Sequence, residues 1–200
     1  MAKIYEFEGI KEISILDYFP SKLHKRMNLT PEQQIVSQFI IDFKNGYKPA
    51  SILAAKIVSQ IITENFNLNE DTIVFIPIPA STKDDTKKRY GLFSYLVSQN
   101  CHVIDGQHLA KNWRETDKKH LSVNHTINGD EHKRWFIDYN KTKNIKAVIF
   151  DDVATTGETA ACFIQRLEKG GAKVIGEIFL ASSFHLKSHL WQNKNNSIKK

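Results

Sequence analysis

Apolar residues recur at three-and-four spacing in two segments of the first third of the chain. In the first segment, Thr30 and Pro31 have the form of an N-cap and a first helical residue, and Gly46 supplies a stop. The apolar positions on one face of this helix are Ile35, Val36, Phe39, Ile40 and Phe43. A second helix is expected after Pro49, with apolar positions at Ile52, Leu53, Ile57, Ile61 and Ile62.

The middle of the chain contains a short, nearly continuous apolar run at residues 72–79 (TIVFIPIP). Such β-branched runs are typical of strands covered on both faces of a sheet, and the prolines predict that the strand ends within 76–79. Residues 81–89 are polar and basic and are expected to form a loop, whereas residues 90–99 return to a helical pattern.

The last third carries the clearest pattern. Residues 145–150 read as a strand, residues 159–169 as a helix closed by Gly170 and Gly171, and residues 174–181 as a second strand. A strand, a helix and a strand in this order predict two parallel strands joined by a right-handed crossover. The expected fold is therefore α/β, with a central, mostly parallel sheet flanked by helices.

Three segments show little periodicity and set the expected domain organisation. Residues 1–30 are irregular and are interpreted as an N-terminal extension packing on the core, which is a domain at residues 31–185. Residues 115–133 are expected to form a long mobile loop, and loops of that length inside a domain tend to be functional. Residues 186–200 are interpreted as a basic C-terminal tail.

Charge and cysteine content narrow the class of protein. A net charge of +6 suits a polyanionic ligand, either nucleic acid or a phosphorylated metabolite, although residues 191–200 contribute three lysines and no acid. The two cysteines, Cys101 and Cys162, form neither a disulfide framework nor a paired metal motif, so a cytoplasmic location is expected. No apolar run reaches the roughly 18 residues of a membrane span, and no membrane association is expected.

The candidate site is the segment 148–159 (VIFDDVATTGET). Asp151 and Asp152 are expected at the carboxyl end of a buried strand, followed by a short turn and a helix start. A helix N-terminus presents unpaired N–H groups to a phosphate, and Gly157 lets the backbone approach it closely. Ionised carboxylates accept hydrogen bonds from vicinal ribose hydroxyls, so the segment favours a ribose phosphate ligand.

The sequence Asp-Asp-Val-x-Thr-Thr-Gly-x-Thr resembles the 5-phosphoribosyl-1-pyrophosphate (PRPP) motif of type I phosphoribosyltransferases. The resemblance implies that Asp151 and Asp152 are the catalytic pair, bind the ribose 2- and 3-hydroxyls, and are the protein groups nearest to a Mg²⁺ cofactor that enters with the pyrophosphate. It implies that the 5-phosphate is bound by Ala154, Thr155, Thr156, Gly157, Glu158 and Thr159.

There is a second resemblance. The strand end at residues 76–79, together with the basic run that follows it, looks like the pyrophosphate loop of the ComF-type branch of that family. It implies that pyrophosphate is bound by Ser81, Lys87, Lys88 and Arg89. Weaker similarity lies at residues 42–46 and 111–121 and at Asn128, and the loop at 115–133 would act as a hood over the site.

Two departures from the family pattern bear on function. Many ComF-type proteins carry an N-terminal cysteine-rich zinc element, whereas residues 1–30 contain no cysteine. Thr155 stands where purine-salvage members place a carboxylate that handles a proton on the purine ring. Because threonine does not exchange a proton near neutral pH, hypoxanthine-guanine salvage is disfavoured.

The expected activity is transfer of a phosphoribosyl group from PRPP to a small nitrogenous acceptor, whose identity is not readable from the sequence. The alternative is a non-catalytic PRPP-fold sensor or accessory protein in DNA uptake or regulation, because a fold can persist without its chemistry. A homodimer and a nucleic-acid partner are left open.

Overall fold

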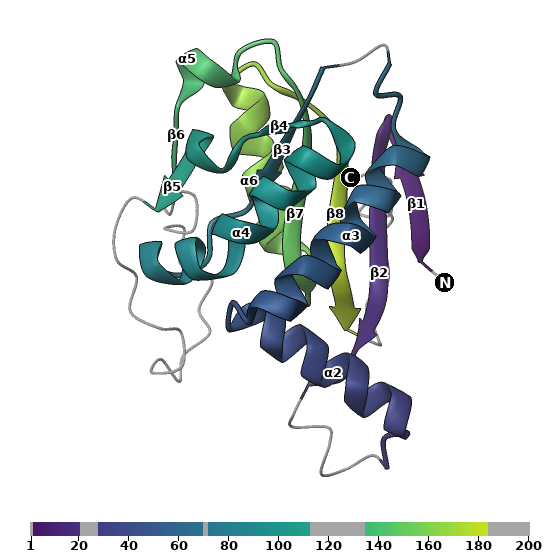
Figure 1. The fold of residues 1–200 in the computed structure, drawn as a ribbon. Coiled ribbons are helices and arrows are strands. Elements are labelled where there is room, and N and C mark those ends of the chain that lie inside the picture. Colours follow the sequence, from purple (N-terminus) through teal and green to yellow (C-terminus); the bar gives the residue numbers. More distant parts are fainter. Residues whose placement is uncertain (1, 21–27, 70–71, 113–134, 184–200) are drawn as a thin grey trace.

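A six-stranded sheet forms the centre of the computed structural model, in the order β1-β2-β8-β7-β3-β4 (Figure 1). The residues that the structure describes are 2–20, 28–69, 72–112 and 135–183. The strands of the sheet are β1 (Lys3–Phe7), β2 (Ile10–Tyr18), β3 (Ile73–Pro77), β4 (Ile104–Asp105), β7 (Lys146–Ala154) and β8 (Lys173–Ser183). Only the β1–β2 pair is antiparallel among these, so the predicted mostly parallel sheet is confirmed.

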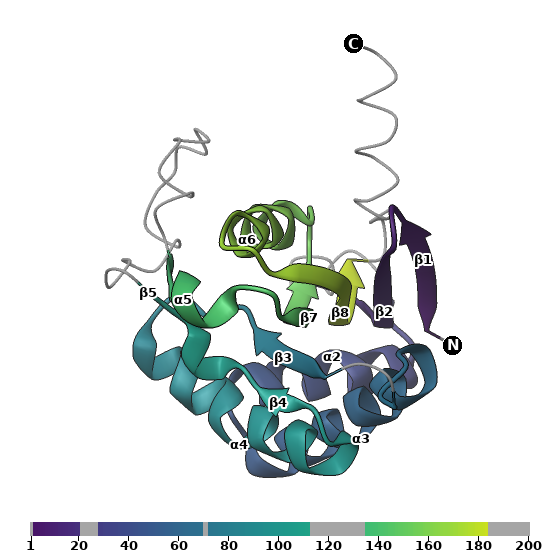
Figure 2. The same ribbon diagram turned by 90° about the horizontal axis from the view of Figure 1, so that it is seen from above.

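Helices cover both faces of this sheet (Figure 2). On one face lie α2 (Pro31–Lys44), α3 (Lys48–Asn65) and α4 (Lys83–Cys101), and on the other lies α6 (Glu158–Lys169). The remaining elements are η1 (Gln107–Leu109), α5 (Tyr139–Thr142) and the separate antiparallel pair of β5 (Ala110–Asn112) and β6 (Trp135–Ile137). Among the described residues, no helix is long and apolar enough to cross a membrane.

Each face of the sheet has its own hydrophobic core. Under α2, α3 and α4 the core is aromatic, and the rings of Phe93 and Phe150 lie 4.6 Å apart between centroids. Under α6, Trp135 packs edge-on against Phe163 at 5.1 Å. β3 is buried along its whole length because both of its faces are covered, which explains its continuous apolar run.

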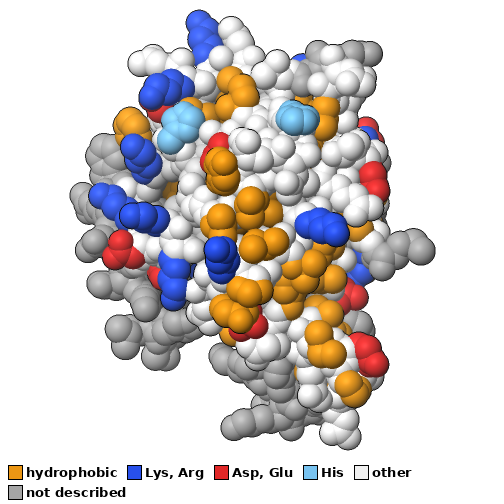
Figure 3. Space-filling model, viewed as in Figure 1, with side chains coloured by type: hydrophobic (Ala, Val, Ile, Leu, Met, Phe, Trp, Pro, Cys, Tyr) orange, Lys and Arg blue, Asp and Glu red, His pale blue; other side chains and the backbone are white. Residues whose placement is uncertain are grey.

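The two N-terminal helices are confirmed, but their buried faces differ from the prediction. Thr30 and Gln33 form a capping box at the start of α2. Ile35 on α2 is 68% exposed, and Ile52 and Leu53 on α3 are 47% and 49% exposed. α3 instead packs inward through small residues and Val58 and Ile62, so part of its apolar surface faces solvent, where Figure 3 shows apolar side chains over these helices.

The prediction that residues 1–30 are irregular was wrong for residues 3–18, which form β1 and β2. β2 pairs in parallel with β8 and contributes Ile13 to the core. The sequence of β2 does not show the alternation of apolar and polar residues that predicts a strand, because Glu12 and Ser14 are polar and yet buried, at 3% and 4% exposure. Residues 115–133 and 186–200, expected to be a mobile loop and a tail, lie outside the described residues.

The expected loop at residues 81–89 is largely helical. Thr82 caps α4 by accepting a hydrogen bond from the Asp85 amide at 3.0 Å, and the helix begins at Lys83. Two acids in the first turn, Asp84 and Asp85, complement the positive end of the helix dipole. Capping and first-turn acids therefore outweighed the polar composition from which a loop was expected.

Gly46, which follows α2, lies against the backbone of α4. Its φ is +67°, and an added Cβ would overlap with the backbone carbonyl of Lys88. Gly9 has a similar φ of +78° but has nothing within 4 Å of an added Cβ. The two glycines therefore share a backbone conformation and differ in the space around them.

We expect Gly46→Ala to lower the free energy of unfolding by about 2 kcal/mol more than Gly9→Ala does. Both variants carry the left-handed backbone cost of about 1–2 kcal/mol, and only the first forces α4 to move. Urea denaturation of the two variants measures the difference. Equal destabilisation would contradict the close approach of Gly46 to α4.

Candidate functional site

β7 carries both aspartates of the candidate site within the strand, not beyond its end. The strand was expected to end at residue 150, but it continues to Ala154. Because successive side chains of a strand point to opposite faces of the sheet, Asp151 and Asp152 lie on different faces. Asp152 shares the face of Phe150, toward α2 and α4, where its ion-pair partners lie, and Asp151 shares the face of Ile149, in the core under α6.

Asp152 is the centre of a buried ion-pair cluster. Its side chain is 7% exposed, and its Oδ2 accepts a hydrogen bond from Nη1 of Arg89 on α4. Its Oδ1 lies 3.5 Å from Nζ of Lys44 at the end of α2. Arg89 also donates from Nε to the backbone carbonyl of Lys44 at 3.2 Å. Both carboxylate oxygens of Asp152 are thus engaged by cations of the chain itself.

The charges of this cluster shift the pKa values of its members. Burial, the largest single effect, lowers the pKa of the Arg89 guanidinium, but the charge of Asp152 together with smaller contributions from Tyr90 and Asp151 outweighs it, so the pKa of Arg89 lies above the ordinary value. Burial, and then the charge of Asp152, raises the pKa of the Tyr90 hydroxyl well above its usual range. Arg89 and Tyr90 therefore stay in their ordinary protonation states, cationic and neutral, near neutral pH.

Asp151 behaves differently from its neighbour. Its Oδ1 accepts a hydrogen bond from the Asp152 backbone amide at 2.8 Å. Burial raises its pKa to about 7, helped by the charge of Asp152 and opposed by that amide, Lys44 and Arg89. Since this pKa lies near physiological pH, Asp151 exchanges a proton in the range where biological reactions occur.

The turn after β7 has the features of an anion site. Gly157 adopts a left-handed conformation with φ of +77° and is the N-cap residue of α6. No side-chain hydrogen bond caps this helix. Thr155 and Thr156 are exposed, Thr159 is half-buried, and Thr156 Oγ1 accepts a hydrogen bond from the Glu158 amide at 3.4 Å. The first N–H groups of a helix lack partners within the helix, so this turn presents amides and hydroxyls together.

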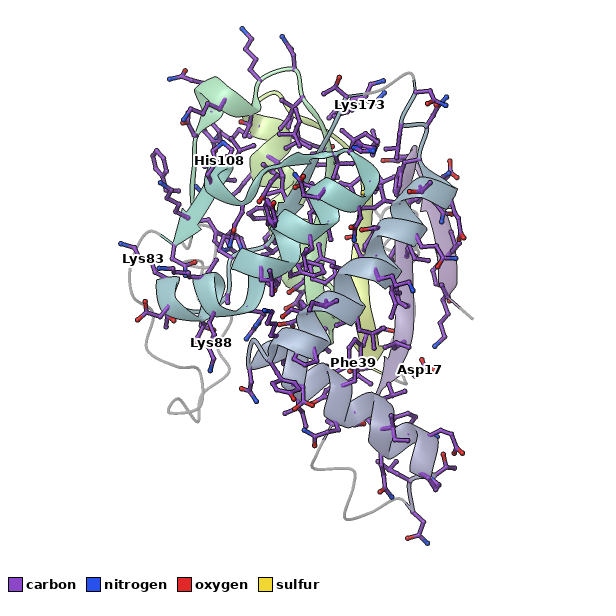
Figure 4. All side chains as sticks on the ribbon, viewed as in Figure 1. Asp17, Phe39, Lys83, Lys88, His108 and Lys173 are labelled. Carbon is purple, nitrogen blue, oxygen red and sulfur yellow. The ribbon has the colours of Figure 1, made fainter. Side chains whose placement is uncertain are left out.

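The structure does not bring the predicted basic residues together. Arg89 points from α4 to Asp152, whereas Lys87 and Lys88 are exposed, and Figure 4 shows Lys88 projecting from the helix surface. Ser81 lies half-buried in the bend between β3 and α4. A loop would have allowed the three cations to converge on one anion, but a helix turns successive side chains by about 100° and separates them.

Sequence reasoning left Lys44 and Tyr90 out of the site. Lys44 falls within residues 42–46, where similarity to the ComF-type branch was noted, so a signal for it existed. Tyr90 follows the basic run and gave no signal beyond its place in a helical pattern. Its ring is completely buried, with the Arg89 guanidinium carbon 5.7 Å from the ring centroid.

A resident metal centre is not formed by the described part of the chain. No group of three or more His, Cys, Asp or Glu side chains lies there in a metal-binding arrangement. Asp151 provides carboxylate oxygen, the donor type that Mg²⁺ prefers, and Mg²⁺ is commonly held by one or two carboxylates together with substrate phosphates. The residues present therefore fit a magnesium ion that arrives with a phosphorylated substrate.

Comparison with known proteins gives distant likenesses only. No family model and no curated protein matches the chain. Among solved structures, a UMP synthase from Leishmania donovani is 16% identical, with a TM-score of 0.43 over 76% of this chain and 26% of the other. An adenine phosphoribosyltransferase from Leishmania tarentolae is 12% identical, with a TM-score of 0.44 over 94% and 98% of the two chains. The chain thus spans about a quarter of the UMP synthase, and at these identities the activity must be argued from the site residues.

Proposed function

We propose that the chain binds PRPP with Mg²⁺ and transfers its phosphoribosyl group to a nitrogenous acceptor. The observation that carries this proposal is the turn at residues 154–159, where the left-handed Gly157 joins a strand bearing Asp151 to the N-terminus of α6. Phosphate-binding amides and a ribose-binding carboxylate thus follow one another in a single connection between strand and helix.

The 5-phosphate would occupy the N-terminal end of α6. The helix has 12 residues, so its dipole places partial positive charge at this end. The exposed hydroxyls of Thr155 and Thr156 add donors, and Gly157 has no side chain to keep the phosphate from the backbone. Ala154 and Glu158 would contribute as parts of the turn backbone.

The ribose would be bound mainly by Asp151. When ionised, its carboxylate accepts hydrogen bonds from the vicinal 2- and 3-hydroxyls. Asp152, which resemblance pairs with it as a ribose ligand, already has both oxygens engaged by Arg89 and Lys44. We therefore assign Asp152 the role of orienting β7 and lowering the tendency of Asp151 to ionise.

The pyrophosphate would lie toward the bend between β3 and α4, near Ser81 and the N-terminal end of α4. Magnesium, held by pyrophosphate oxygens and Asp151, would neutralise charge on the leaving group. The separation of Lys87 and Lys88 from Arg89 argues against the grouped cationic site implied by resemblance.

In the reaction, the bond between ribose C1 and the pyrophosphate oxygen breaks, and a bond from C1 to the acceptor nitrogen forms. The pyrophosphate departs with the electron pair of the broken bond, and the acceptor nitrogen releases its proton to solvent. The chain contributes by fixing the ribose, the 5-phosphate and the pyrophosphate so that C1 faces the acceptor.

The first prediction concerns Asp151. Asp151→Asn should weaken PRPP binding at least about tenfold, because an amide replaces an ionised acceptor of two hydroxyl donors. Isothermal titration of PRPP with Mg²⁺ measures the change. The control is Asp138→Asn, which removes a partly exposed carboxylate 3.4 Å from Lys141, away from the turn, and should bind PRPP normally.

The outcomes separate binding from catalysis. Absence of PRPP binding by the unmodified chain would overturn the proposal. Binding that depends on Asp151, without pyrophosphate release in the presence of any nucleobase acceptor, would leave the accessory-protein function instead of the transferase.

The second prediction concerns pH. Because the pKa of Asp151 is raised to about 7, its carboxyl is ionised above that pH and neutral below it. PRPP affinity should therefore fall as the pH is lowered from about 8 to about 6. Titration of PRPP phosphate oxygens contributes to the same range, so the comparison is with Asp151→Asn, whose affinity should vary less. Parallel pH profiles would show that Asp151 does not bind the ribose.

The third prediction tests the structural role of Asp152. Arg89→Met should lower the free energy of unfolding by about 3 kcal/mol, because it leaves a buried carboxylate without its principal partner. The double variant Arg89→Met with Asp152→Leu should recover most of that loss, since no buried carboxylate remains and the Lys44 side chain, at 35% exposure, is solvated. Urea denaturation measures both. A double variant as unstable as the single one would contradict the ion-pair explanation.

A further inference from the structure

An apolar patch lies on the outer surface of α3 and α4. It consists of Ile52 and Leu53 on α3 and of Leu92 and Tyr95 on α4, whose side chains are 37–54% exposed. Figure 3 shows apolar side chains gathering over these helices on this face of the molecule. Single exposed apolar residues are ordinary on a protein surface, whereas a contiguous group of them marks an interaction surface.

Two contacts between α3 and α4 indicate that the four side chains form one group. Gly46, just before α3, lies against the backbone of Lys88, and the Ser59 side chain lies beside the Cys101 thiol further along both helices. Each contact joins residues 42 positions apart, so the two helices run side by side in the same direction (Figure 1). The two apolar residues of α3 therefore lie at the same level as the two of α4.

The rim of this apolar patch is basic. Lys48 and Lys56 lie about one helical turn before and after it on α3, and Lys88 lies one turn before it on α4. All three lysines are exposed, and within the described part of the chain none has a carboxylate within 4.0 Å. No acidic residue lies within one turn of the patch on either helix. The surface therefore matches a partner whose apolar side chains are flanked by acidic ones.

The start of α3 gives a second reason for an acidic partner. The N-terminal end of a helix carries partial positive charge, which an acid in the first turn or a capping side chain usually balances. α3 begins with Lys48 and has no acid in its first turn, and its N-cap Tyr47 makes no side-chain hydrogen bond to the helix. An acidic side chain of a bound partner would balance both the lysine and the helix dipole.

Gly91 is the observation that favours a helical partner over a lipid surface. It lies within α4 beside Leu92, where glycine lowers helix stability relative to alanine, and an added Cβ would project into open space. Each of the other described glycines has a positive φ or lies where a Cβ would come within 3.0 Å of a neighbouring residue. Bare backbone at Gly91 lets a second helix approach α4 closely, which acyl chains do not require.

We propose that the apolar patch is a docking surface for an amphipathic α-helix whose apolar face is flanked by acidic residues. Apolar anchors of the partner pack on the four patch residues, its acidic side chains meet the lysines of the rim, and its backbone passes over Gly91. A second copy of this chain placed face to face would bring lysines against lysines, so the charges argue against it. This surface does not depend on the proposed transferase activity.

The test uses a fluorescent synthetic peptide of about 18 residues, with leucines at three-and-four spacing on one face and glutamates on the other. Fluorescence anisotropy with the full chain should show that this peptide binds at least about fivefold more tightly than a scrambled peptide of the same composition, because only the ordered peptide forms an apolar face. A version with lysines in place of the glutamates should bind at least about fivefold more weakly, because the rim of the patch repels it.

Three variants locate the binding surface. Leu53→Asn and Gly91→Gln should each weaken peptide binding about fivefold or more, the first by loss of an apolar contact and the second by filling the space that the partner backbone needs. Gly91→Gln should keep or raise the melting temperature, because glutamine favours a helix more than glycine does. The control is Ile4→Asn on β1, where the apolar side chain is equally exposed at the sheet edge far from α4, and binding should change by less than about twofold.

Several results would overturn the proposal. These are equal affinities for the ordered and scrambled peptides, unchanged binding in Gly91→Gln, and an equal loss in Ile4→Asn. Dimerisation of the full chain in sedimentation that is lost in Leu53→Asn would assign the patch to a second copy. Binding to phosphatidylserine vesicles that is lost in Leu53→Asn, without peptide binding, would assign it to a membrane surface. Because peptide binding is read without PRPP, failure of PRPP to bind would leave this test intact.

Discussion

The buried carboxylate of Asp152 is the constraint on which the arrangement of the site depends. A charge at 7% side-chain exposure is tolerated only with partners, and these come from the end of α2 and the second turn of α4. Arg89 also holds the Lys44 carbonyl, so one guanidinium connects two helices to the central strand. The positions of both helices relative to β7 therefore follow from satisfying one carboxylate.

The same cluster gives two adjacent aspartates different properties. Asp152 is held beside two cations, while Asp151, on the other face of the strand, experiences burial and the negative charge of its neighbour. Its pKa of about 7 is a consequence of that position, since an isolated aspartate titrates far lower. Two consecutive carboxylates thus have different surroundings, and the turn ending at Gly157 places the amides proposed to bind phosphate directly after them.

The basic residues of α4 also have different surroundings, because they lie on two sides of the helix. Its inward side carries Arg89 to the ion-pair cluster, and its other side carries Lys83 and Lys87 to a cavity that is also lined by His108, Lys111 and Asn112. Asn112 connects that cavity to the bend after β3 through the Ala80 carbonyl. The bend proposed to receive pyrophosphate therefore lies near both groups of cations, of which Arg89 is paired with Asp152.

The sequence by itself determined the parallel β7–α6–β8 unit, the buried β3 and the position of the turn between strand and helix at residues 154–159, because these depend on local periodicity and glycine conformation. It did not reveal β2, whose polar Glu12 and Ser14 are buried only through neighbouring strands, nor the outward direction of Ile52 and Leu53. The partners of Asp152 and the separation of Lys87 from Arg89 were also decided by tertiary structure. Such contacts join residues far apart in the chain, and their charges interact according to distances that only the folded packing sets.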